Sequence, residues 1–219
     1  EAITAYMPSF AGLELETELQ HLSRILLHPQ KPLVIIVGGG KARDKLMVVR
    51  YFREMADFFL VGGVAANTLL SLQGIDVGRS VVDGDPADAK YFRAILRYSN
   101  VILPMDWKKR NNRILDIGPR TIRQFRNVIA RARTIIWSGP MGLFEQKPYA
   151  RGTLAIAKAI AKNRRAFSLI GGGETVAFLK ECRLDKKFSF VSTGGGAMLE
   201  FLAGKKLPGI EALRSENRK

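Results

Sequence analysis

The segment LVIIVGGGKARDK, residues 33–45, decides the fold of this chain, because a short apolar run passes directly into three glycines and a charged stretch. Continuous β-branched runs of this kind are typical of strands buried on both faces of a parallel sheet. The succession recurs after FFLV at residues 62–63, after FSLI at 171–173 and after FSFVST at 194–196. A glycine turn between a strand and a helix presents backbone N–H groups to an anion, so the recurrence predicts one ligand with several phosphates.

Apolar runs and helical patterns alternate on both sides of this segment. The sequence predicts six strands, at Leu33–Val37, Phe58–Val61, Val101–Pro104, Thr134–Trp137, Ala166–Ile170 and Phe188–Val191. It predicts helices at Leu13–Leu27, Asp44–Ala56, Pro86–Tyr98, Pro119–Ala132, Ala150–Lys162 and Glu174–Glu181, and shorter ones from Val64 and Gly196. The expected fold is a Rossmann-like, three-layer α/β/α domain with a six-stranded parallel sheet. Such sheets bind ligands at the carboxyl ends of their strands, where all the glycine clusters lie.

Composition sets limits on the class of protein. The 219 residues are 47% hydrophobic and 25% charged, which suits a chain with a substantial core. No apolar stretch reaches the roughly 18 residues of a membrane helix and no signal pattern opens the chain, so we expect no membrane partner and a cytoplasmic protein. The lone Cys182 forms no internal disulfide, and only two histidines are present, which argues against structural zinc. We expect residues 1–29 to form a helical region outside the main domain, 30–219, and the chain to be a segment of a longer protein.

The net charge of +15 and the pI near 10.2 attract phosphates of any kind. A basic loop, KKRNNR at 108–113, is followed by Arg120, Arg123 and Arg126 at three-residue spacing on a predicted helix. A nucleic-acid groove would interleave exposed aromatic residues, which this segment lacks. Its Phe125 instead belongs to the buried side of an ordinary amphipathic helix. The pattern therefore favours a solvated basic face over a nucleic-acid site.

The common nucleotide fingerprints are absent. GxxxxGK[ST] does not occur, which excludes a P-loop. GxGxxG fails at each cluster, because its sixth position holds Arg43, Val176 or Leu199. A less common phosphate-binding arrangement remains.

The residues beside the glycines indicate what that arrangement could bind. Lys41 and Lys45 can present two ammonium groups on one side of a helix start to a polyphosphate, or can be exposed first-turn lysines. In GGGET, Glu174 can hold Mg²⁺ and Thr175 can donate to a phosphate oxygen, although both residue types favour helix starts without a ligand. WSGPMGLFE, 137–145, is a rigid loop that could contact a base and a ribose or plug the core.

Together these motifs resemble, end to end and in order, the C-terminal, nucleotide-binding domain of phosphoglycerate kinase. The resemblance is carried by MPSFAGLELETELQHLSRILLHPQKPLVIIVGGGKARDK (7–45), LVGGVAANTLLSLQGIDVGRS (60–80), LDIGPRTI (115–122), TIIWSGPMGLFEQKPYARGT (134–153), LIGGGETVAFL (169–179) and FSFVSTGGGAMLEFLAGKKLPGIEAL (188–213). It implies a monomeric glycolytic kinase that reversibly transfers the acyl phosphate of 1,3-bisphosphoglycerate to Mg-ADP, giving 3-phosphoglycerate and ATP.

The resemblance also assigns residues to parts of a nucleotide site. It implies an adenine side and a neighbouring wall, formed by Gly39, Gly40, Gly63, Pro140, Gly142 and Leu143, with Glu145 at the ribose. It implies a phosphate side, formed by Lys41, Lys45, Gly172, Gly173, Glu174 and Thr175, with Glu174 at the magnesium position. Phosphoryl transfer needs positioning and neutralisation of charge rather than a general base. We therefore expect the transition state to be stabilised by Lys41 and by the N–H groups of Gly172, Gly173, Gly195 and Gly196.

Four positions depart from the family pattern. The family usually has Asp where Glu174 stands, Asn where Ser138 stands, and Gly where Val64 and Ile114 stand. Glu174 reaches about one methylene further than Asp, which changes the expected metal geometry. Val64 and Ile114 add bulk near the expected adenine pocket.

The resemblance covers one half of a two-sided active site. In the family, arginines and histidines of a separate N-terminal domain hold the phosphoglycerate, and hinge closure unites the two halves. We expect the present segment to bind ADP or ATP without turnover. Two alternatives stay open, namely a non-catalytic binding module of the same fold and a basic protein that binds nucleic acid.

Overall fold

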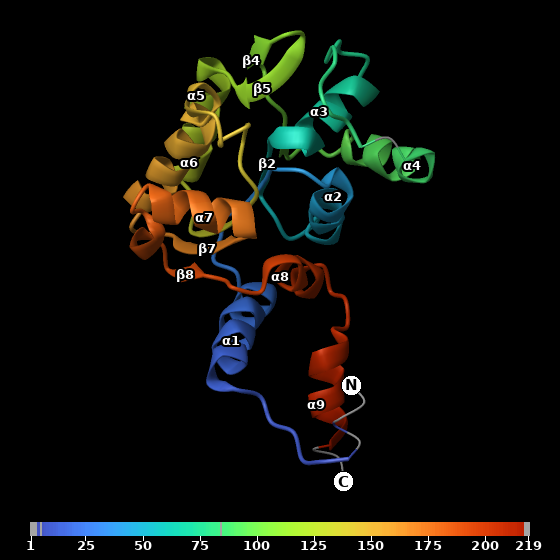
Figure 1. Ribbon diagram of the computed structural model, residues 1–219, viewed down its shortest axis with the longest axis vertical. Helices are drawn as coiled ribbons and strands as arrows, with labels where there is room; N and C mark the ends of the chain where they lie inside the picture. The colour runs from blue at the N-terminus through green and yellow to red at the C-terminus, as the bar shows by residue number, and fades with distance from the viewer. Residues whose placement is uncertain (1–3, 5, 84, 217–219) are drawn as a thin grey trace.

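The computed structural model describes residues 4, 6–83 and 85–216, and its centre is a six-stranded parallel sheet (Figure 1). The strands lie in the order β3-β2-β1-β6-β7-β8. Their bounds are Val101–Ile102 (β3), Phe58–Val61 (β2), Leu33–Val37 (β1), Thr134–Ser138 (β6), Phe167–Gly171 (β7) and Phe190–Val191 (β8). The predicted α/β class, parallel sheet and number of strands in it are confirmed. Both edge strands contain only two residues each.

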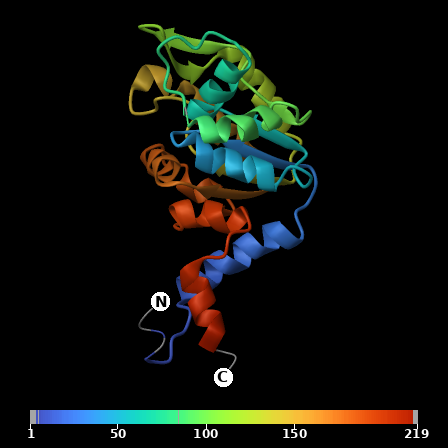
Figure 2. The same ribbon diagram turned by 90° about the vertical axis from the view of Figure 1, so that its right-hand side faces the viewer.

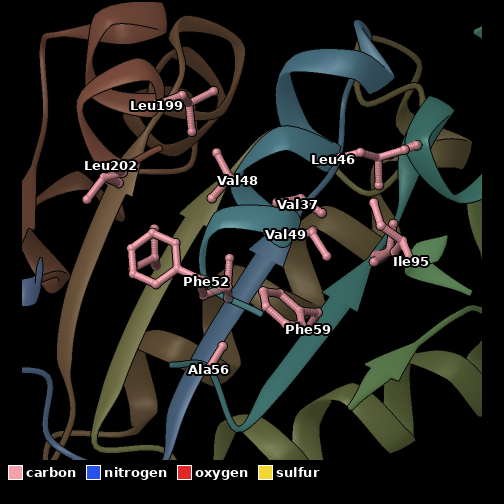
Figure 3. Packing of buried hydrophobic residues seen from close by; sticks show 14 of the residues in the cluster. Val37, Leu46, Val48, Val49, Phe52, Ala56, Phe59, Ile95, Leu199 and Leu202 are labelled. Atoms are coloured by element: carbon pink, nitrogen blue, oxygen red, sulfur yellow. The ribbon is translucent and has the colours of Figure 1, made fainter. Parts of the chain in front are cut away.

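Helices cover both faces of the sheet, because side chains along each strand alternate between two apolar cores. Leu33, Ile35 and Val37 of β1 face one core, and Val34 and Ile36 face the other. The first core is covered by α1 (Leu13–Leu27), α2 (Ala42–Tyr51), α3 (Gly63–Leu72), α4 (Pro86–Ile95) and α8 (Gly195–Leu202). Figure 3 shows apolar side chains of this layer gathered over the strands. The second core is covered by α5 (Pro119–Ile129), α6 (Arg151–Lys162) and α7 (Gly173–Glu181).

The structure corrects the sequence reading of residues 107–117. The stretch that was expected to be a basic loop forms an antiparallel hairpin of β4 (Trp107–Arg110) and β5 (Arg113–Ile117), which stands apart from the main sheet. Asn111 and Asn112 form its turn with φ of 49° and 56°. Two consecutive left-handed residues are typical of a type I′ turn, and asparagine adopts this conformation more readily than most residues.

Several predicted boundaries also differ. Helix α2 begins two residues earlier than predicted, at Ala42, and ends at Tyr51 rather than Ala56. The sequence reading missed a final helix, α9 (Pro208–Glu216), which follows α8 after a short turn. Figure 2 shows α1 and α9 extending below the sheet domain. In the described part of the chain, no helix is both long and apolar enough to cross a membrane.

A buried glutamate fastens α1 to the domain. Glu18 is 7% exposed and accepts hydrogen bonds from the Ser192 hydroxyl (2.8 Å) and from the backbone N–H of Thr193 (2.6 Å). The Thr193 hydroxyl also donates to it, at 3.0 Å. These bonds hold the segment that connects β8 to the last glycine cluster.

Candidate functional site

Two adjoining cavities lie at the carboxyl edge of the sheet. The first has a volume of about 280 Å³, and its lining is mainly apolar. The second has a volume of about 230 Å³ and is lined mainly by glycines, lysines and carboxylates. Gly40 and Glu174 line both, so the cavities adjoin there. We call them the apolar cavity and the glycine cavity.

The apolar cavity contains all the residues that the sequence reading assigned to an adenine side, its wall and the ribose. These are Gly39, Gly40, Gly63, Pro140, Gly142, Leu143 and Glu145. Val64 and Ile114 line the same cavity, as expected from the added bulk at these positions. The sequence reading missed Trp107 and Arg113, which reach the cavity from the hairpin. Recognition of the Asn-Asn turn would have predicted the hairpin that carries both residues, but not its place at the cavity.

The glycine cavity brings together residues from four strand ends. Its lining includes every residue expected on the phosphate side, namely Lys41, Lys45, Gly172, Gly173, Glu174, Thr175, Gly195 and Gly196. Asp44 also lines it, although the sequence allowed this residue to be an ordinary first-turn acid. Backbone N–H groups at the starts of α7 and α8 lie at this cavity, where helix dipoles favour an anion.

Lys41 has a backbone conformation that a lysine seldom adopts. It precedes α2 with φ of 52° and ψ of 67°, in the left-handed region, and it lies between the first glycines and the helix. A non-glycine residue there costs of order 1 kcal/mol, and such strain concentrates at functional sites. The exposed Lys41 side chain is at the mouth of the glycine cavity.

Lys45 is the more enclosed of the two lysines. Its Nζ donates to Oγ of Ser138, at 2.8 Å, and the serine is 1% exposed at the end of β6. Burial lowers the pKa of Lys45 below its ordinary value, whereas the charges of Asp44 and Glu174 act to raise it and that of Lys41 to lower it. A phosphate in this cavity would act to raise the pKa of Lys45 again, because a nearby negative charge favours the ammonium form.

The turn after β6 depends on glycine. Gly139 has a φ of 94°, and a Cβ atom there would lie 2.1 Å from the carbonyl oxygen of Gly38. The two glycine turns after β1 and β6 therefore touch, which no larger residue would permit. The N–H of Gly139 donates to Oγ1 of Thr175 at 2.9 Å, which connects the turn to α7.

The carboxylates suit a magnesium ion that is held chiefly by phosphates. Glu174 and Asp44 both line the glycine cavity, and Mg²⁺ is commonly bound through one or two carboxylates, water and substrate phosphates. Among the described residues there is no cluster of three or more metal-ligating side chains. The donor set thus fits a metal that arrives with a polyphosphate and does not fit a resident ion held by protein alone.

Like Glu145 and Glu174, Asp116 also lines the apolar cavity. It is 2% exposed, and its carboxylate accepts hydrogen bonds from the N–H groups of Gly152 (2.8 Å) and Ile117 (2.9 Å). Burial raises the pKa of Asp116 from 3.8 to about 6, although these two bonds and the charges of Lys108 and Arg151 act to lower it. Asp116 therefore links β5 to the start of α6.

The fold is that of an open α/β sheet, a class in which ligands bind at the carboxyl ends of the parallel strands, and the two cavities and the glycine turns lie at that edge. A family model described as phosphoglycerate kinase matches residues 1–205. The chain belongs to the phosphoglycerate kinase family.

Individual relatives agree. The phosphoglycerate kinase of Acidobacterium capsulatum is 41% identical over 97% of this chain and 59% of its own length. The solved phosphoglycerate kinase of Coxiella burnetii superposes with a TM-score of 0.86 at 36% identity, covering 98% of this chain and 61% of that one. The enzyme from Pyrococcus horikoshii OT3 gives the same TM-score at 32% identity, covering 99% and 60%. The chain thus spans about three fifths of the length of these relatives.

Proposed function

We propose that this chain is the nucleotide-binding part of a phosphoglycerate kinase. The whole protein would reversibly transfer the acyl phosphate of 1,3-bisphosphoglycerate to Mg-ADP, and residues outside this chain would hold the phosphoglycerate. One observation carries the proposal: an apolar cavity and a glycine cavity lie next to each other and share Gly40 and Glu174 in their linings. A flat apolar base beside a chain of phosphates is the ligand shape that this combination fits.

The proposed arrangement puts the base in the apolar cavity and the ribose beside Glu145. The α- and β-phosphates would lie in the glycine cavity, where Lys41 and Lys45 neutralise charge on their oxygens. The N–H groups of Gly172, Gly173, Gly195 and Gly196 would face the transferring phosphoryl group and stabilise charge on its equatorial oxygens. The protein would act by positioning and charge, because the attacking phosphate oxygen of ADP needs no general base.

Glu174 would hold Mg²⁺ through its carboxylate, and when bound the ion would neutralise phosphate charge. Asp44 lines the same cavity and is a second candidate for this contact. The expectation of a monomeric, cytoplasmic protein stays a prediction.

Calorimetric titration of Mg-ADP and Mg-GDP tests the nucleotide site. We expect Mg-ADP to bind the wild-type chain and to bind the Lys41→Ala variant at least 10-fold more weakly, a loss typical of one charge-assisted contact. Lys90→Ala removes an exposed lysine from α4, away from both cavities, and serves as the matched control. Equal binding by Lys41→Ala and Lys90→Ala would refute the assigned phosphate site.

A coupled assay with 1,3-bisphosphoglycerate tests the second part of the proposal. The chain alone should give no turnover, since its contribution is one side of a closing site. Robust phosphoryl transfer by the chain alone would overturn this. Val64 and Ile114 favour one rival, a non-catalytic module, because they reduce the apolar cavity. That rival predicts no Mg-ADP binding even by the full-length protein.

A further inference from the structure

The positive charge of this chain is concentrated on one side of the fold. Residues 104–166 contain fifteen Lys and Arg but only three Asp and Glu, so they carry +12 of the net charge of +15. Two of the three acids are engaged within the protein, because Asp106 accepts bonds from the start of α5 and Asp116 is buried. The stretch from Pro119 to Arg165, which holds α5 and α6, therefore has Glu145 as its single acid.

Six of these cations lie on the outward sides of helices α5 and α6. The two helices pack side by side on one face of the sheet (Figure 1). On α6, Arg151, Lys158 and Lys162 are separated by seven and four residues, which puts them on one side of the helix. On α5, Arg120, Arg123 and Arg126 lie on the side opposite the buried Phe125 and Ile129. All six cations are exposed, and we call this set the basic face.

The protein neutralises the basic face only in part, because the charges of Asp106 and Asp116 act on two of its six cations, Arg120 and Arg151. Within the described part of the chain, none of the six side chains forms an ion pair or a hydrogen bond. Unscreened like charges destabilise a compact fold, so a bound anion would relieve their repulsion. The face is distinct from both cavities, because none of the six residues lines either of them.

The chemistry of the face selects one kind of polyanion. A membrane surface would use apolar residues for insertion, and neither helix carries an exposed large hydrophobic side chain. A single-stranded nucleic acid would use exposed aromatic residues for base stacking, and the only aromatic residue of the two helices, Phe125, is fully buried. Four of the six cations are arginines, whose planar guanidinium groups suit phosphate oxygens.

We propose that the basic face of α5 and α6 binds the phosphate backbone of double-stranded nucleic acid without reading its sequence. The twelve residues of α6 span about 18 Å, and over that length a duplex carries about ten phosphates. Six cations on one side can contact about five of these phosphates. This activity goes beyond the proposed kinase function and does not depend on it. It reverses the sequence-based preference for a solvated basic face, because the lack of exposed aromatic residues argues against stacking of single-stranded bases and not against contact with a duplex backbone.

The test is fluorescence anisotropy of a labelled 20-base-pair duplex of mixed sequence, titrated with the chain at several salt concentrations. Contact with about five phosphates predicts a slope of about −4.5 for log K against log salt. Arg123→Glu with Lys158→Glu should weaken binding by at least 10-fold. The matched control, Lys90→Glu with Arg93→Glu, makes the same change in net charge on α4, across the sheet, and should change binding less than 3-fold. A second double variant, Arg126→Gln with Lys162→Gln, removes two charges of the basic face without reversing them and keeps good helix formers at both positions.

Four results would overturn the proposal. Equal losses in the α5/α6 and α4 variants would mean that net charge alone attracts the duplex. Displacement of the duplex by saturating Mg-ADP would indicate that the duplex binds at the cavities and not at the basic face. Tighter binding of a single strand, or equal binding of poly-glutamate with matched charge, would identify a different polyanion. Circular dichroism and thermal melting confirm that each variant is folded before these results are interpreted.

Discussion

The replacement Asp116→Asn tests whether a buried carboxylate makes this domain less stable at neutral pH. Burial raises the pKa of Asp116 from 3.8 to about 6, so between these pH values the folded chain binds more protons than the unfolded chain. Stability from this group is therefore full below about pH 3.8 and is lost as the pH rises through 6. Proton linkage puts the loss at about 2 kcal/mol between about pH 4.5 and 7.5.

The asparagine variant cannot ionise and should lack this loss. Its amide can accept only one of the two bonds that Asp116 accepts from Gly152 and Ile117, so the variant should be destabilised at both pH values. The informative quantity is how the difference from wild type changes with pH. Relative to wild type, the variant should gain about 2 kcal/mol on going from about pH 4.5 to 7.5.

Urea denaturation at the two pH values measures this change. With a slope near 2 kcal/mol per molar urea, the relative midpoint should shift by about 1 M. Saturating Mg-ADP should be left out, because ligand binding adds its own contribution to stability. If wild type and variant keep a constant difference at both pH values, Asp116 is not titrating in this range and the reasoning fails.

Three further changes have expected outcomes. Asp106→Asn should show the opposite pH dependence. Burial acts to raise the pKa of Asp106, but hydrogen bonds from Thr121 and the α5 backbone outweigh it and lower the pKa. The stability that this carboxylate contributes is therefore present above pH 3.8 and lost as the pH falls below it, which the same urea series checks. Gly139→Ala should destabilise by roughly 3 kcal/mol or more, measured by urea midpoint, because its φ is 94° and its Cβ would overlap Gly38; a change under 1 kcal/mol would contradict the glycine contact. Glu18→Ala should cost roughly 3 kcal/mol, since it buries nothing in place of the carboxylate and leaves the buried Ser192 hydroxyl and the part-buried N–H of Thr193 without this acceptor, whereas the exposed Glu14→Ala should cost under 0.5 kcal/mol in the same assay.

The sequence predicted the sheet well because its strands are continuous apolar runs. The two central runs, β1 and β6, are buried along their whole length, so hydrophobicity alone marks them, whereas the edge strands β3 and β8 are only partly buried and are shorter than predicted. The glycines behind the strands mark the edge where the two cavities lie. The candidate cavities followed from the same signal, since carboxyl ends of parallel strands meet at one edge. The hairpin at 107–117 was missed because its cations resembled a solvated loop, and its turn depends on two asparagines in the left-handed region.

Contacts between distant residues could not be predicted in this way. The bond from Lys45 to Ser138 joins positions 93 residues apart, and it depends on the adjacent alignment of β1 and β6. Asp116 likewise has its role only through Gly152, 36 residues further along the chain. Neither residue type carries a local signal for such partners. The pairing of β1 with β6 brings the first two residues together, and the packing of β5 against the start of α6 brings the second two together.

The brevity of β3 and β8 has a consequence for how this domain behaves in solution. These two-residue strands close the sheet at its two ends, so each edge offers few unpaired backbone N–H and C=O groups. A long, flat edge would be a template for pairing with another polypeptide, and this sheet has none. We expect the purified domain to resist edge-to-edge aggregation even at high concentration, which light scattering can check.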